Sequence, residues 1–303
     1  MSIVVHTVLP IAILLGIGAG LQRAFRLDVR TLSKLIFYLF FPTVLFVTAY
    51  ESELTWDTAG TIALFLVAYY AILYGTTELY AAWRRLEPRR RGTMRNSVVL
   101  DNNANYGIPL NQLVFSHDAL ALSVQLVVMT VQTLLVNSFG VYNVASRFDR
   151  AAFWRKIAGL PSVYALAIGF ACNAFELDVP GAIYAPIAFV ADAFLAFALV
   201  TLGIQLGSIR WSFGGADAVA ALALKLAFAP AVGIGLLLAF GIEGMTASAL
   251  LLSCTVPSSL AGVLLAIEFD SDVEFASQTA FASTLLSIVT VSLWIAVVDG
   301  TAL

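Results

Sequence analysis

The stretch Asp101-Asn102-Asn103-Ala104-Asn105-Tyr106-Gly107-Ile108-Pro109 decides the fold, because it lies in the middle of a long apolar segment. In hydrocarbon, each unpaired polar group costs several kcal/mol. Proline also removes a helical hydrogen bond and disfavours helix at the residue before it. We therefore expect a membrane helix that is interrupted here, with a break formed by Asn102, Asn103, Asn105, Gly107 and Pro109.

A second stretch, Ser253-Cys254-Thr255-Val256-Pro257-Ser258-Ser259, interrupts another apolar segment in the same way. If the two unwound middles meet near the membrane midplane, their half-helix N termini present free N–H groups with a partial positive charge. Asparagine amides and serine hydroxyls would orient an anion there, and the candidate binding residues of this second break are Thr255, Pro257, Ser258 and Ser259. The alternative is a pair of proline kinks whose backbone groups are satisfied by neighbouring helices.

The composition places the 303-residue chain in a membrane. It is 60% hydrophobic and 12% charged, with a mean hydropathy of +0.92, whereas soluble domains have about 45–50% apolar and about 25% charged residues. These values exclude a disordered chain, a nucleic-acid binder and a disulfide scaffold. The first apolar run lacks preceding positive charge and a small-residue cleavage motif, so we expect a retained span rather than a signal peptide.

Apolar runs of about 20 residues, the length that crosses a bilayer core, occur ten times along the chain. Glycines 16, 18 and 20 in the first run indicate close helix packing. The predicted spans are Ile3–Leu21, Leu32–Ala49, Thr58–Ala82, Thr93–Ser116, Ala119–Ala145, Ile157–Phe175, Ile183–Gly207, Ala216–Phe240, Thr246–Ile267 and Phe275–Val298.

The cations predict the orientation of these spans. All but one of the 16 lysines and arginines lie in or beside the connections between spans 1 and 2, 3 and 4, 5 and 6, and 7 and 8. The positive-inside rule makes these connections cytoplasmic, in a multi-pass protein of the cytoplasmic membrane. Both termini are then predicted to be extracytoplasmic. The remaining cation, Lys225, lies inside span 8.

The ten spans divide into two halves of five, residues 1–150 and 151–303. Residues 24–28 (AFRLD) and 174–178 (AFELD) end spans 1 and 6 at an offset of 150. Because five is odd, the second half enters the membrane from the opposite side. This predicts an all-α membrane fold of two inverted five-helix repeats with broken crossover helices 4 and 9, an arrangement common in secondary transporters.

Charged and amide side chains inside spans are functional candidates, because burying them in a bilayer is costly. Lys225 could neutralise a bound carboxylate, pair with Glu78 or Asp192, replace a coupling cation, or snorkel to the cytoplasmic face. Asp101 is the one acid beside the predicted crossing of the broken helices, and Gln125 in span 5 is a candidate cavity-lining residue.

These features favour a secondary transporter for a small organic anion, with no cofactor and with protons or sodium as candidate coupling ions. An enzyme is not expected, because two histidines and two cysteines offer neither a metal cluster nor a catalytic triad. The alternatives are a cation/proton antiporter of similar crossed-helix fold, an intramembrane enzyme and a non-transporting sensor.

The chain also resembles the auxin efflux carrier family of membrane transport proteins, which includes bacterial malate and malonate permeases and plant auxin exporters. The most specific likeness is Asn102-Asn103-Ala104-Asn105-Tyr106-Gly107-Ile108-Pro109, which is similar to the family crossover motif Asn-x-x-Asn-x-Gly-x-Pro. Asn103 is an extra polar residue within that motif. Weaker similarities are residues 32–50 with Pro42, Ala191-Asp192 through Leu202-Gly203, residues 225–230 (KLAFAP), Val256-Pro257 and residues 283–286 (STLL).

The resemblance implies a fold and a mechanism. Spans 1, 2, 6 and 7 would form a scaffold that makes a homodimer in the lipid bilayer. Spans 3–5 and 8–10 would form a transport unit that moves past the scaffold as an elevator and carries the crossover site. The implied substrate is malate, malonate or an auxin-like acid, although the large cytoplasmic loop of many plant exporters is absent.

Overall fold

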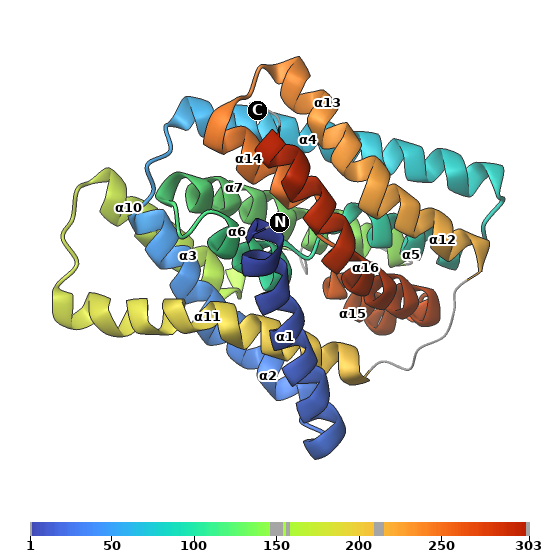
Figure 1. Cartoon of the computed structure of the whole chain (residues 1–303), viewed down its shortest axis with the longest axis horizontal. Helices are drawn as coiled ribbons and strands as arrows, with labels where there is room; N and C mark the ends of the chain where they lie inside the picture. Colours follow the sequence, from blue (N-terminus) through green and yellow to red (C-terminus); the bar gives the residue numbers. More distant parts are fainter. Residues whose placement is uncertain (1, 146–153, 156–157, 209–214, 301–303) are drawn as a thin grey trace. The chain divides into compact units, whose positions relative to one another are not determined.

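The computed structural model describes the backbone of residues 2–145, 154–155, 158–208 and 215–300, and the side chains of these residues from 9 to 296. This described part of the chain is helical and contains no β-strand (Figure 1). Its elements, with π-helical segments labelled η, are α1 (Ser2–Phe25), α2 (Val29–Leu35), η1 (Ile36–Phe40), α3 (Phe41–Tyr50), α4 (Trp56–Trp83), α5 (Pro88–Val99), η2 (Asn103–Gly107), α6 (Ile108–Val114), α7 (Ala119–Leu135), η3 (Val136–Gly140), α8 (Val141–Val144), α10 (Pro161–Ala174), α11 (Gly181–Ser208), α12 (Ala216–Ala223), η4 (Leu224–Phe228), α13 (Ala229–Phe240), α14 (Gly244–Cys254), α15 (Leu260–Glu268) and α16 (Val273–Gly300).

Six helical segments in the described chain are long and apolar enough to cross a membrane, so the protein is a multi-pass membrane protein. They correspond to predicted spans 2, 3, 5, 7, 8 and 10. The helices of spans 1 and 6 and the first half of span 9 are apolar but shorter, with apolar segments Leu9–Phe25, Pro161–Ala174 and Gly244–Cys254. The complete set of ten spans and the inverted repeat stay predictions. Four of the cations used for orientation, Arg147, Arg150, Lys156 and Arg210, lie outside the described residues.

Both predicted helix interruptions are confirmed. In span 4, α5 ends at Val99 and the chain is extended before η2 begins at Asn103. In span 9, α14 ends at Cys254 and α15 begins at Leu260. Each interruption therefore falls at the polar, proline-containing stretch that the sequence singled out.

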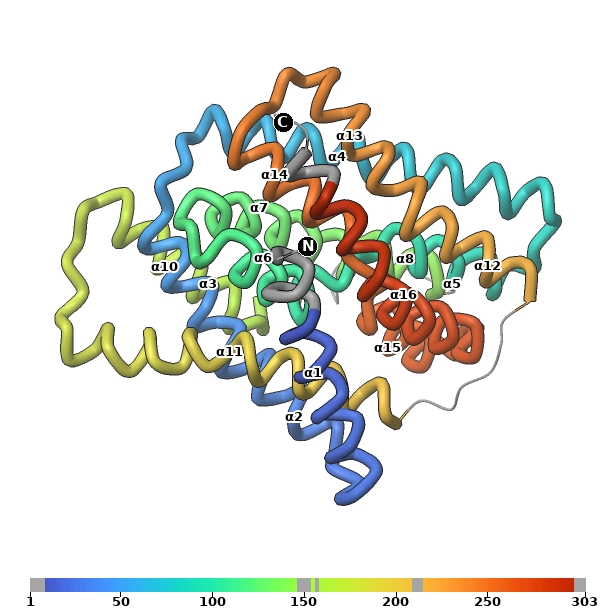
Figure 2. The backbone as a smooth tube through the Cα atoms, viewed as in Figure 1, coloured from blue at the N-terminus to red at the C-terminus, as the bar shows by residue number. Residues whose placement is uncertain are grey.

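Three of the π-helical segments stand directly before a residue that is followed by proline. These prolines are Pro42 after η1, Pro109 after η2 and Pro230 after η4. Proline donates no N–H to the carbonyl four residues earlier, and that carbonyl lies inside the preceding π-helical segment in each case. At Leu226 the carbonyl is satisfied instead by the indole N–H of Trp294, at 3.1 Å. The helix continues through the segment, as the trace from α12 to α13 shows (Figure 2).

Contacts divide the chain into two compact units. Unit 1 contains residues 1–55, 104–126 and 151–208, and unit 2 contains residues 56–103, 127–150 and 209–303. The helices of spans 1, 2, 6 and 7 thus belong to unit 1, while those of spans 3, 8, 9 and 10 belong to unit 2. Residues 104–126, which the family resemblance assigned to the transport unit, cluster with unit 1 because α6 packs on α1 and α11. The division into repeats at residue 150 stays a prediction.

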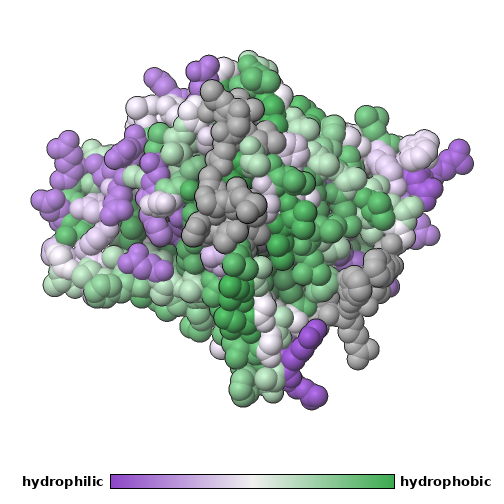
Figure 3. Space-filling view, viewed as in Figure 1, coloured by the Kyte–Doolittle hydropathy of each residue, from purple (hydrophilic) through white to green (hydrophobic). Residues whose placement is uncertain are grey.

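Unit 1 is built on a close crossing of α1 with α11. A Cβ atom added at Gly18 would lie 2.1 Å from the carbonyl oxygen of Val200, and one at Gly203 would lie 2.2 Å from that of Leu15. The expectation of close packing is therefore confirmed at Gly18, and it is wrong at glycines 16 and 20, which face no atom within 4 Å. From residue 9 on, the visible side of α1 is mainly apolar until its last turn (Figure 3).

The predicted cytoplasmic connection between spans 1 and 2, in unit 1, is followed by a helix with a capped N terminus. The Asp28 carboxylate accepts hydrogen bonds from the backbone N–H groups of Arg30 and Thr31, which begins α2. The Thr31 hydroxyl also donates to this carboxylate and lowers the pKa of Asp28. Near the other end of the unit, Asn173 donates to the carbonyl oxygens of Tyr50 at 2.7 Å and Ser52 at 3.1 Å. These bonds tie α10 to the end of α3.

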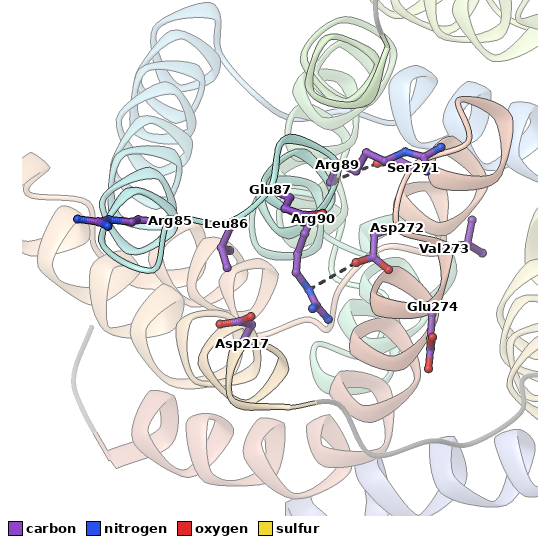
Figure 4. A pocket seen from close by; sticks show the side chains of 10 residues that line it. All are labelled: Arg85, Leu86, Glu87, Arg89, Arg90, Asp217, Ser271, Asp272, Val273 and Glu274. Atoms are coloured by element: carbon purple, nitrogen blue, oxygen red, sulfur yellow. Dashed lines mark hydrogen bonds and ion pairs between the residues drawn. The ribbon is translucent and has the colours of Figure 1, made fainter.

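Unit 2 surrounds the two helix interruptions with α4, α5, α13, α14, α15 and α16. One end of the unit is polar and contains a cavity of about 620 Å³ (Figure 4). Arg90 and Asp272 point toward each other in this cavity and form an ion pair at 3.4 Å. Nearby, Asp217 accepts from Arg84 at 3.2 Å, and this hydrogen bond raises the pKa of Arg84. Charges of both signs therefore line the cavity, and Arg90 and Asp272 pair within it.

Candidate functional site

The two helix interruptions of unit 2 satisfy each other's backbone. The N–H of Asn102 donates to the carbonyl oxygen of Pro257 at 2.9 Å, and the N–H of Ser259 donates to that of Leu100 at 2.8 Å. The pair forms an isolated antiparallel bridge between Asp101 and Ser258. Open backbone groups are not tolerated in hydrocarbon, so this pairing explains how two helices can be unwound inside a span.

Ser258 fastens the bridge to its neighbours. Its hydroxyl donates to the carbonyl oxygen of Ser97 at 2.5 Å, and its backbone N–H donates to the hydroxyl of Ser283 at 3.1 Å. Ser97 in turn contacts the Thr279 hydroxyl at 3.0 Å. The bridge is therefore held between the last turn of α5 and the middle of α16.

Lys225 is fully buried in η4 and forms an ion pair with Asp101. Its ammonium also donates to the carbonyl oxygen of Val98 at 3.2 Å, in the last turn of α5, where the helix dipole favours a cation. The expected alternatives of pairing with Glu78 or Asp192 are wrong, and so is snorkelling to the membrane surface. Glu78 pairs with Arg91 and Arg95 of α5 instead.

Two residues that sequence reasoning missed hold Asp101 in place. The Tyr70 hydroxyl lies 2.9 Å from the Asp101 carboxylate and 2.7 Å from the Gln132 side-chain oxygen. The Gln132 side-chain NH₂ donates to the carbonyl oxygen of Asp101 at 3.1 Å. The signal for Gln132 was its spacing of seven residues from Gln125, which places both amides on one face of α7.

The side-chain amide of Asn102 is a buried hydrogen-bond donor that has no acceptor among the described residues. The residue is 3% exposed, and its side-chain NH₂ has no hydrogen-bond partner among the described residues. A buried donor left unpaired costs about 1–3 kcal/mol, so it is a candidate group for holding a ligand. Asn103 is buried beside it at the start of η2 in unit 2.

The remaining residues of the first break belong to unit 1. Asn105 is buried there, and its side-chain oxygen has no hydrogen-bond partner among the described residues. Gly107 has helical backbone angles and precedes α6, in which Pro109 occupies the first turn. Gln125 is also buried in unit 1, in the first part of α7. The site prediction thus covers residues from both units.

Other predicted site residues stabilise helix ends. The Thr255 hydroxyl donates to the carbonyl oxygen of Leu252 at 2.7 Å, where α14 ends. The Ser259 side chain accepts from the N–H of Ala261 at 3.2 Å and caps α15. Pro257 contributes its carbonyl oxygen to the bridge, and Asp192 lies on an exposed face of α11 in unit 1. Through these contacts, Thr255 and Ser259 stabilise the ends of α14 and α15.

A family model described as "Membrane transport protein" matches residues 150–295 of the chain. This match includes Lys225 and the whole second interruption. The second half of the chain is thus similar to a family of membrane transport proteins. The family resemblance derived from the crossover motif is thereby confirmed.

Two relatives of this chain are named as transporters. An uncharacterized transporter of Methanothermobacter thermautotrophicus is 24% identical over 300 residues, which cover 95% of this chain and 96% of that protein. An uncharacterized transporter of Methanocaldococcus jannaschii is 21% identical over 275 residues, or 88% of each chain. Family and relatives point to membrane transport rather than to an enzyme.

Proposed function

We propose that this protein is a secondary transporter for a small organic anion, most simply a carboxylate such as malate, malonate or an auxin-like acid. One observation carries the proposal: the side-chain NH₂ of Asn102, at the paired helix breaks, has no hydrogen-bond partner among the described residues and lies next to the buried Asp101–Lys225 ion pair. A carboxylate offers oxygens that accept from such a donor.

The charges around the breaks support an anion as the substrate. Asp101 and Lys225 balance each other, so the paired breaks carry no net charge of their own. The helices that begin at Asn103 and Leu260 add the partial positive charge of their N termini. Asn102, Asn103 and Ser258 are the proposed binding residues of unit 2, and Asp101 with Lys225 is the proposed charge-coupling pair.

The transport mode is part of the same proposal and rests on the family. We propose two inverted five-helix repeats, an elevator movement of a transport unit against a scaffold, and a homodimer formed through the scaffold. The proposed location is the cytoplasmic membrane with both termini outside. Exporting an anion from a negative-inside cell is favoured by about 2.3 kcal/mol per charge at 100 mV, whereas uptake requires a coupled cation such as a proton or sodium.

Uptake of radiolabelled acids into liposomes that contain the purified protein tests the proposal. Asn102→Ala should lower the transport rate about tenfold or more, because a hydrogen bond to a charged group contributes about 1.5–3 kcal/mol. The matched control is Asn137→Ala, since the Asn137 amide donates only within its own helix to Thr133, at 2.9 Å. Equal rates for Asn102→Ala and Asn137→Ala would show that Asn102 does not bind the substrate.

A cation/proton antiporter is the second candidate, and the buried Asp101 favours it. Its carboxylate lies at the meeting of two interrupted helices and is paired with the ammonium of Lys225. A cation that binds Asp101 would replace this ammonium, and Lys225 would then release its proton. Vesicles without any organic acid distinguish the two candidates. Sodium-dependent changes of internal pH that disappear in Asp101→Asn would support the antiporter.

A further inference from the structure

An apolar groove of about 320 Å³ runs along one face of α4 in unit 2. It is lined almost entirely by apolar atoms, and Val67 at its rim is 60% exposed, so the groove opens toward the surroundings of the span. Its α4 side follows the helical spacing i, i+3, i+4 and i+7. The lining on α4 is Val67, Tyr70, Ala71 and Tyr74, and Leu135 and Phe139 form the opposite side.

A cluster of three charged residues continues this face beyond the groove. Glu78 follows Tyr74 by one helical turn, and both Arg91 and Arg95 pair with its carboxylate. Two cations on one acid leave a net charge of +1. The Arg95 guanidinium also lies over the Tyr74 ring, 5.4 Å from its centroid, which makes the cluster continuous with the groove. The Nε of Arg91 has no hydrogen-bond partner among the described residues.

The position of the cluster along α4 corresponds to the headgroup level of a bilayer. Trp83 at the end of α4 is 76% exposed, and exposed tryptophans on spans gather at the membrane–water interface. Glu78 precedes Trp83 by five residues, which is about 7.5 Å along a helix. The groove, two turns and more from Trp83, is then at the depth of the acyl chains.

We propose that the groove and the cluster together bind one anionic phospholipid of the cytoplasmic leaflet. An acyl chain lies in the groove against Ala71, and the phosphate contacts Arg91 and Arg95. The occupant is amphipathic because the site itself is apolar at one end and cationic at the other. It is anionic because Glu78 neutralises only one of the two arginines, which leaves one positive charge for the headgroup.

The bound chain would contact a residue of the ion-pair network. The Tyr70 ring lines the groove, while its hydroxyl lies 2.9 Å from the Asp101 carboxylate. Occupancy of the groove therefore restricts the side chain that holds Asp101 toward Lys225. This lipid site is separate from the proposed substrate site, and its test does not depend on any transport.

Native mass spectrometry of the delipidated full-length protein tests the proposal. Phosphatidylglycerol and phosphatidylcholine with identical acyl chains are titrated in separate experiments. We expect phosphatidylglycerol to bind about fivefold more tightly, because a cation near the membrane surface contributes about 1 kcal/mol to binding an anionic lipid. Equal binding of the two lipids to the unmodified protein would overturn the proposal.

Two substitutions separate the headgroup contact from the chain contact. Arg91→Gln removes the net charge, so the two lipids should then bind within about twofold of each other; Arg23→Gln, an exposed arginine at the end of α1, should keep the preference. Ala71→Trp fills the groove and should abolish binding of both lipids. Its control is Ile72→Trp, because the Ile72 side chain is 40% exposed and lies on another face of α4.

Unchanged lipid binding in Ala71→Trp, or an unchanged preference in Arg91→Gln, would each overturn the proposal. If Arg91→Gln fails to fold, Glu78→Gln replaces it. That variant raises the net charge of the cluster and should strengthen the preference for phosphatidylglycerol; a weakened or equal preference would contradict the site. Soluble glycerol 3-phosphate should not bind at lipid concentrations, and tight binding of it would show a headgroup-only site.

Discussion

Lys225 and Asp101 are each buried in the middle of a span, and each is stable there only because of the other. Removing one partner of a buried ion pair leaves an uncompensated charge and costs about 3–5 kcal/mol. Lys225→Met and Asp101→Asn should therefore both melt at lower temperature in detergent than the unmodified protein. The double variant leaves no unpaired charge, so it should recover a large part of the loss.

Thermal melting followed by fluorescence-detected size-exclusion chromatography measures this order of stability. Lys34→Met is the matched control, because Lys34 is exposed on α2 and should tolerate the change. A double variant that melts no higher than either single variant would mean that the two charges are not each other's main partners.

The sequence predicted which residue types form the candidate site, but it predicted only part of the contacts between them. Three asparagines and a proline in nine residues predicted the break, because unpaired polar groups are costly inside an apolar segment. The partner of Lys225 could not be derived, since 124 positions separate it from Asp101 and pairing depends on how the helices pack. The role of Tyr70 could not be predicted for a different reason. A tyrosine in a membrane span does not by itself indicate a contact with Asp101, and only the position of its hydroxyl in the structure shows that contact.

At the level of elements, the crossing of α1 and α11 depends on Gly18 and Gly203, which have no room for a side chain. An alanine at position 18 would put its Cβ 2.1 Å from the Val200 carbonyl oxygen, so the helices would have to separate. Gly18→Ala should lower the melting temperature of the protein in detergent. Gly20→Ala, one turn or less away and without any atom within 4 Å, should be neutral or slightly stabilising, because alanine favours helix.

The same comparison shows how far helix packing follows from sequence. Glycines 16, 18 and 20 look equivalent in an apolar run, and only the position of α11 distinguishes them. The interruptions of spans 4 and 9 were predictable from local chemistry alone. Their pairing through Asn102 and Pro257 was expected only in outline, as two unwound segments that meet. If Gly18→Ala and Gly20→Ala melt alike, the α1–α11 contact is looser than the structure indicates.

At the scale of the whole molecule, the charged end of unit 2 bears on the predicted orientation. Arg84 of the connection after span 3 pairs with Asp217 at the start of span 8, and Arg89 pairs with Asp270 between spans 9 and 10. These three connections therefore lie at one end of the unit. An even number of crossings separates them in the ten-span arrangement, which also puts them on one side. The ion pairs thus agree with the alternation of spans in this half of the prediction.

Cysteine accessibility in a Cys172→Ala background tests the complete arrangement. Cys254 is buried and should stay unreactive toward a membrane-impermeant maleimide. New cysteines at Ser52 and Glu243 should react in intact cells, because both connections are predicted to be extracytoplasmic. New cysteines at Leu86 and Ser271 should react only in inside-out vesicles. Labelling of positions 86 and 271 from opposite sides would contradict both the ten-span order and the shared end of unit 2. Labelling of positions 86 and 271 in intact cells, with positions 52 and 243 reacting only in inside-out vesicles, would invalidate the positive-inside assignment.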